Sequence, residues 1–148
     1  LHKEYRRQRQ MCIRDRLKAG FEFGRFPEIM EMAGGDPDKV TLEMFCESAA
    51  QEHSDSVKLM LDLANILGEA LGMAVNILAP EVVVLSGQLA QLGEPFFQEI
   101  SKVLERNVVQ EIYQGLKVTA SVFNEYIGAI GAAAYAMQEE FDFIDKQI

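Results

Sequence analysis

The chain has 148 residues, 49% of them hydrophobic and 25% charged, which is enough apolar material for one globular domain or one lobe of a larger one. Its formal net charge is −9 at pH 7. A surface this acidic repels a phosphate backbone, so this part of the protein is not expected to bind nucleic acid itself.

We expect no membrane span, because charged residues interrupt the most apolar helix before it reaches the roughly 18 apolar residues that a span needs. No apolar stretch near the start has the form of a secretory signal. The two cysteines, Cys12 and Cys46, match neither a disulfide framework nor a metal-ligand spacing. These observations together predict a cytoplasmic protein.

Residues 1–16, LHKEYRRQRQMCIRDR, are basic and show no apolar period. One interpretation is a disordered tail, and another is a basic arm that contacts nucleic acid or anionic lipid. A third is that MCIRDR is the translation of an adaptor used to build sequencing libraries, fused to a truncated gene. Inspection of the coding DNA would decide this. We assign no function to residues 1–16 and treat residues 17–148 as the part that folds.

Two short helices are predicted first. Pro27 suits the first turn of one helix, and Gly34–Gly35 ends it. Thr41 suits the N-cap of the next helix, whose apolar face includes Cys46. We interpret this cysteine as a small core residue rather than a reactive thiol.

The longest predicted helix begins at Ser54 and stops at Pro80. Its apolar residues recur with helical spacing: Met60, Leu63, Ala64, Leu67, Ala70, Leu71, Ala74 and Leu78. Gly68 and Gly72 lie one turn apart, and each costs about 1 kcal/mol relative to alanine in a helix. Their presence predicts that another helix packs closely here. The polar Asn76 is expected to satisfy a neighbouring backbone group.

Two strands and two further helices follow. Val82–Leu85 is apolar without alternation, which predicts a strand covered on both faces of a parallel sheet. A helix is expected from Gly93 to Gly115, then a strand over Lys117–Val122. A last helix opens at Ile127, and its small residues, Gly131 among them, predict close packing. This order predicts an α/β fold with a right-handed crossover.

The turn Ser86, Gly87 and Gln88 follows the first strand. Ligands collect at the carboxyl ends of parallel strands, and a glycine lets backbone amides approach a ligand closely. These three residues are therefore the candidate binding residues. The sequence shows no catalytic set and no metal-binding cluster. His53 stands alone before a helix, and we interpret it as structural.

Three segments resemble the carboxyl-terminal half of the ROK family (repressors, open reading frames, sugar kinases). Val75–Glu81 resembles its NLLNPE segment, Val83–Gly87 its glycine-bearing strand end, and Gly128–Ala133 its closing GAxGAA helix. The resemblance runs from about Phe26 to Met137. It implies the second lobe of an actin-like (ribonuclease H-like), hexokinase-type ATPase fold, helix-rich with a short partial sheet, and a cleft for nucleotide and sugar between two lobes.

The resemblance implies that Ser86, Gly87 and Gln88 lie near the adenosine end of a bound nucleotide, with ATP as the cofactor if the parent protein is a kinase. Family kinases carry two or three consecutive glycines there, whereas this chain has Gly87 alone. The 148 residues also lack the family's phosphate loop, catalytic aspartate, sugar-binding Glu-Gly-His segment and zinc loop. We therefore expect no catalytic residue, cofactor or metal in the fragment itself.

Three hypotheses remain. The favoured one is a fragment of a sugar-responsive transcriptional regulator, with sugar bound between the lobes and DNA bound by a helix-turn-helix outside this chain. The alternative is a fragment of an ATP-dependent, glucokinase-like sugar kinase. The third is an incomplete lobe without activity of its own. Because the family often dimerises through this lobe, a homodimer is also expected.

Overall fold

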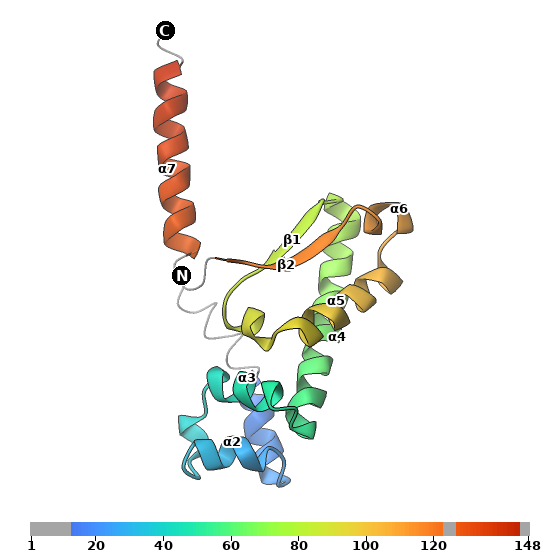
Figure 1. Ribbon diagram of the computed structural model, residues 1–148, viewed down its shortest axis with the longest axis vertical. Coiled ribbons are helices and arrows are strands. Elements are labelled where there is room, and N and C mark those ends of the chain that lie inside the picture. The colour runs from blue at the N-terminus through green and yellow to red at the C-terminus, as the bar shows by residue number, and fades with distance from the viewer. Residues whose placement is uncertain (1–12, 123–126, 146–148) are drawn as a thin grey trace.

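The computed structural model describes residues 13–122 and 127–145 (Figure 1). A helix covers residues 13–22. The elements after it are α2 (Pro27–Met32), the 3-10 helix η1 (Pro37–Lys39), α3 (Leu42–Ala50), α4 (Ser54–Leu78), β1 (Val82–Leu85), the 3-10 helix η2 (Gln88–Leu92), α5 (Glu94–Asn107), α6 (Gln110–Tyr113), β2 (Lys117–Ala120) and α7 (Ile127–Asp145). In Figure 1 the first helices form one end of the molecule, and α4 runs from them to the sheet.

The two strands form a parallel pair, as the alternation of strands and helices predicted. Val82 lies opposite Lys117, and Leu85 lies opposite Ala120. The chain between them forms η2, α5 and α6. The helix-rich α/β class with a short sheet is therefore confirmed.

The sheet is covered on one face rather than two, which corrects the expectation for β1. Val83 and Leu85 pack against the hydrophobic core. Val82 and Val84, which point to the other face, are 47% and 53% exposed. Apolar strand residues indicate that a face is suited to burial, but they do not show that the same chain supplies the cover.

α4 and α5 are packed closely at two glycines, which confirms the prediction made from their spacing. A Cβ added at Gly68 would lie 2.7 Å from Cβ of Val103, and one at Gly72 would lie 3.3 Å from Cβ of Asn107. The core around this contact is made of fully buried α5 side chains, Phe96, Ile100, Val103 and Leu104 among them. Glycine here removes the side chain that would hold the helices apart.

The buried stripe of α4 agrees in part with the predicted one. It follows Met60, Ala64, Gly68, Gly72 and Val75, in steps of one turn. The prediction had included Ala70, Ala74 and Leu78, which are exposed. The predicted Leu63, Leu67 and Leu71 are partly buried and pack against the core.

The opposite side of α4 carries exposed apolar side chains. Ile66, Met73 and Ile77 are 51%, 66% and 81% exposed. By length and composition alone, α4 is the one helix in the described part of the chain that could cross a membrane. From the sequence we expect no such helix, because charged residues interrupt its apolar run. In the fold, its other side packs against α5.

Asn76 joins the end of α4 to the end of α5. Its Nδ2 donates to the carbonyl oxygen of Asn107 at 2.8 Å, and its Oδ1 accepts from the N–H of Val109 at 2.9 Å. This confirms that Asn76 satisfies neighbouring backbone groups. These bonds also explain why the single helix expected up to Gly115 is broken between α5 and α6. In an unbroken helix, the carbonyl of Asn107 and the N–H of Val109 would bond to other groups of the same helix.

The local signals in the first helices are confirmed. Pro27 is the first residue of α2, and Oγ1 of Thr41 accepts from the N–H of Met44 at 3.3 Å at the start of α3. The helix over residues 13–22 crosses the proposed boundary at residue 16, with Ile13 buried in the core. Residues 1–12 lie outside the described part, so the nature of the basic segment stays a prediction.

α7 extends away from the rest of the molecule (Figure 1). Residues 128–138 are all exposed, and a Cβ added at Gly128 or Gly131 would meet no atom within 4 Å. The close packing expected at Gly131 is therefore wrong for this chain. Small residues permit a close approach, but the described residues bring no element near this helix.

Gly68→Ala should destabilise the chain. The added Cβ overpacks the contact with Val103, which costs about 1–3 kcal/mol and exceeds the gain of about 1 kcal/mol in helix propensity. Gly131→Ala is the matched control, because it adds the same atom in a helix without any contact. Urea unfolding would measure both, and equal midpoints for the two variants would contradict the packing argument.

Asn76→Asp should also lower the free energy of unfolding, by about 0.5–1.5 kcal/mol. A carboxylate still accepts from Val109 N–H but cannot donate to the carbonyl of Asn107. Asn65→Asp is the control, because Asn65 bonds only to Leu61 O within α4. The urea midpoint should fall further for Asn76→Asp, and a smaller fall than in the control would count against a bridging role.

Candidate functional site

The predicted turn lies open at the carboxyl end of β1. Ser86 and Gly87 are exposed, and Gly87 has φ 86° and ψ −166°, a conformation that favours glycine. The N–H of Ala90 donates to the carbonyl oxygen of Gly87 at 3.1 Å, so the chain turns directly into η2. Gln88 is the first residue of η2. Backbone groups of this turn are thus accessible to a ligand.

Ser121 lies beside this turn, which the sequence analysis missed. Its N–H donates to the carbonyl oxygen of Leu85 at 2.8 Å, directly after the last paired residues of the strands. The prediction had placed Ser121 inside a longer strand. The parallel register brings the two strand ends together, and the pairing of Leu85 with Ala120 could be read only from the structure.

A groove of about 610 Å³ lies between α5 and β2. Its lining residues come from η2, α5, β2 and the connection before α5: Ala90, Gly93, Glu94, Phe97, Gln98, Ser101, Lys102, Val118, Thr119 and Ala120. Nζ of Lys102 lies 3.1 Å from Oε2 of Glu99. Ser86 and Gly87 are not among the residues that line the groove. They are connected to it through the bond from Ala90 to Gly87.

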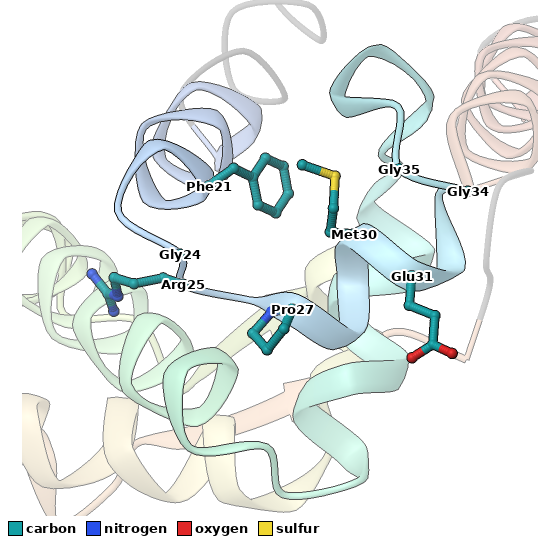
Figure 2. Close-up of a pocket in the computed structure, with 8 residues that line it drawn as sticks. All are labelled: Phe21, Gly24, Arg25, Pro27, Met30, Glu31, Gly34 and Gly35. Atoms are coloured by element: carbon teal, nitrogen blue, oxygen red, sulfur yellow. The ribbon is translucent and has the colours of Figure 1, made fainter.

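A second hollow of about 580 Å³ lies between the helix over residues 13–22 and α2. Figure 2 shows the ring of Phe21 and the side chain of Met30 facing each other across it, whereas the charged ends of Arg25 and Glu31 extend away. Nε of Arg25 instead lies 3.3 Å from Oδ1 of Asp55. Specific small-molecule sites combine an apolar lining with converging polar groups, so this hollow is the weaker candidate.

His53 lies directly before α4 and contacts two neighbouring side chains. Its Nδ1 lies 3.4 Å from Oε1 of Glu28, and its Nε2 lies 3.1 Å from Oε1 of Gln51. Across residues 13–122 and 127–145, no group of three His, Cys, Asp or Glu side chains is arranged to hold a metal. The interpretation of His53 as a structural residue agrees with these contacts.

The described part of the chain has two ionisable groups with a clear pKa shift, Cys46 and Asp38. Burial raises the pKa of the Cys46 thiol to about 11, and the nearby Glu43 carboxylate adds to this effect. The Lys18 ammonium, which bonds to the Asp38 carboxylate, lowers the pKa of that exposed group. Cys46 is thus a protonated core residue at neutral pH, in agreement with its interpretation from sequence.

Comparison with known families settles the descent of the chain. The family model described as "ROK family" matches residues 19–139. The chain belongs to the ROK family. The match includes the Ser86–Gln88 turn and most of α7, and it extends somewhat further than the resemblance read from the three motifs.

Two individual proteins that this chain is similar to carry different names. A protein of Caldicellulosiruptor sp. (strain Rt8B.4) named "Putative xylose repressor" is 24% identical over 99 residues, which are 67% of this chain and 25% of that protein. The glucokinase of Thermotoga maritima is 23% identical over 123 residues, which are 83% of this chain and 38% of that enzyme. The chain therefore spans between a quarter and two fifths of these relatives.

A solved structure shares the fold. The crystal structure of a ROK family transcriptional regulator, described as a homologue of the E. coli MLC protein, matches with a TM-score of 0.68. It is 22% identical, and the match covers 78% of this chain and 28% of that one. At this identity the likeness concerns the fold alone.

The thiol of Cys46 should react slowly with Ellman's reagent at pH 8. With its pKa raised from 9.0 to about 11, the thiolate fraction falls about a hundredfold relative to the unfolded chain. A Cys12→Ser background isolates Cys46. Rates should be compared with and without urea, and equal rates would contradict its burial.

By linkage, the free energy of unfolding should fall as pH rises from 9 towards 11, because only the unfolded chain has lost the Cys46 proton in that window.

Proposed function

We propose that this chain is part of the carboxyl-terminal lobe of a sugar-responsive transcriptional regulator of the ROK family, with an actin-like fold. The likeness to the ROK regulator structure and to the protein named as a xylose repressor supports this proposal. A longer protein would supply a second lobe, and the sugar would bind in the cleft between the two lobes.

The observation that carries the proposal is the open strand end. Gly87 is exposed, and a Cβ added to it would meet no atom within 4 Å. Val82 and Val84 of β1 are about half exposed. A strand with such residues is suited to burial against further protein. The second lobe would close over this side of the sheet, leaving the Ser86–Gln88 turn at the edge of the cleft.

The lone glycine favours a regulator over a kinase. In a kinase of this family the turn would lie near the adenosine of ATP, and family kinases carry two or three consecutive glycines there. The turn here has Gly87 flanked by Ser86 and Gln88, so two of its three residues carry side chains where close approach to a nucleotide would be needed. A turn with one glycine therefore leaves less room for backbone contact with a nucleotide than the family kinases have. A sugar-responsive regulator has no such requirement.

The second candidate is a sugar kinase of the glucokinase type. It is supported by the Thermotoga maritima glucokinase, whose match covers 83% of this chain. In this alternative the Ser86–Gln88 turn lies near the adenosine of ATP. The other lobe then supplies the catalytic aspartate and the grip on the phosphates.

In the regulator, DNA would be bound by a helix-turn-helix outside this chain, since the chain itself carries a net charge of −9. Sugar binding would change the relative orientation of the lobes and so the affinity for DNA. A cytoplasmic location and a homodimer complete the proposal.

The test uses the full-length protein encoded by the gene that contains this chain. Fluorescence anisotropy measures operator DNA binding with and without xylose or glucose, and a coupled assay measures ATP hydrolysis. We expect one sugar to weaken DNA binding by about tenfold, a coupling of ordinary allosteric size. Gly87→Ala should reduce this response, whereas Gly115→Ala, in the turn before β2, should leave it unchanged.

Sugar-dependent ATP hydrolysis that disappears when the catalytic aspartate is replaced would overturn the regulator and establish the kinase. If the full-length protein shows no sugar response and no ATP hydrolysis, both candidates are rejected.

A further inference from the structure

η2 is flanked by two glycines, and each of these glycines has a backbone conformation that other residues rarely adopt. Gly87 has φ 86° and ψ −166°, and Gly93 has φ 76° and ψ −171°. Such angles are essentially restricted to glycine. A Cβ on Gly87 would meet nothing within 4 Å, and one on Gly93 would meet only Cδ of Pro95, at 3.9 Å. Glycine is therefore required by the backbone on each side of η2, not by crowding.

η2 also connects two parts of the molecule. Its first residue, Gln88, is the last residue of the strand-end turn. At its other end Leu92 is 5% exposed in the core, and Leu89 packs against the same core. η2 packs against α3, and in Figure 1 it is the short coil between β1 and α5 that lies next to α3. The turn thus reaches the helical end of the molecule through one short element.

We propose that η2 is a mechanical link that transmits ligand binding at the Ser86–Gln88 turn to α3. The inference rests on the proposed function, because it takes that turn as the ligand site. A ligand that binds one backbone conformation of Gly87 more tightly favours that conformation. The two glycines absorb the change in dihedral angles, so η2 moves as a unit.

α3 follows the movement because Leu92 is held in the core with it. α3 packs in turn against α2, so the change reaches the helices over residues 13–50 rather than the sheet. The sheet is the rigid side of the link, because β1 is held by its pairing with β2. By linkage, a change imposed on α3 alters ligand affinity at the turn by the same factor.

The first experiment needs no ligand. Gly87→Ala strains the strand side of η2 without touching α3, and native-state hydrogen exchange is followed residue by residue. We expect the amides of Phe45–Ala49 in α3 to exchange about tenfold faster, and those of Ile100–Leu104 in α5 to change much less. Gly115→Ala is the control, because its added Cβ meets only the carbonyl oxygen of Ile112, at 3.9 Å.

An unchanged rate in α3, or an equal acceleration in α3 and α5, would overturn the link, because the second result reports only a general loss of stability. A similar effect on α3 in the Gly115→Ala control would also overturn it.

The second experiment adds glucose, xylose or Mg-ATP to the full-length protein that contains this chain, because the proposed cleft needs both lobes, and it separates the link from the site. Protection of the Ser86–Gln88 amides together with altered exchange in α3 supports both. Protection of the turn alone overturns the link and leaves the site standing. No protection of the turn counts against the site, and the Gly87→Ala result then decides the link on its own.

Discussion

The close contact between α4 and α5 holds the rest of the structure in place. At Gly68 the two helices approach so closely that a Cβ would lie 2.7 Å from Cβ of Val103. α4 leads directly into β1, and α5 lies on the path from β1 to β2. The bonds of Asn76 to the backbone around Val108 fix the far end of this helix pair. The position of the sheet, and of the turn at its end, follows from that contact.

The remaining apolar surface is oriented for contacts that the described residues do not make. One side of α4, the outer face of the sheet at Val82 and Val84, and the described side chains of α7 over residues 128–138 are all exposed. Exposed apolar side chains that gather on a protein surface are typical of interaction sites. Under the proposed function, a second lobe and a second copy of the protein would cover these surfaces. The relatives, of which the chain spans 25% and 38%, are long enough to supply such a lobe.

The choice between a regulator and a kinase depends on the Ser86–Gln88 turn. The parallel register places Ser121 beside the end of β1, and Gly87 leaves the backbone there open. Such an edge suits ligand binding whether the parent protein is a regulator or a kinase. What separates the two proposals is the chemistry that each requires. A kinase must bind ATP, and a turn with a single glycine leaves little room for close backbone contact with the nucleotide, whereas a regulator needs only a ligand that prefers one arrangement of the lobes.

The sequence by itself determined the features that depend on neighbours along the chain: the strand Val82–Leu85, the cap at Thr41, the close helix contact implied by Gly68 and the ROK family motifs. Helix caps, strand runs and glycine spacing act over a few residues, so they can be read locally. The tertiary structure decided which of the predicted α4 residues are buried, where the helix after Gly93 breaks and that Ser121 joins the strand end. Those features depend on contacts between residues about thirty positions apart, such as the bond from Asn76 to Asn107, and no local pattern specifies which groups will meet across that separation.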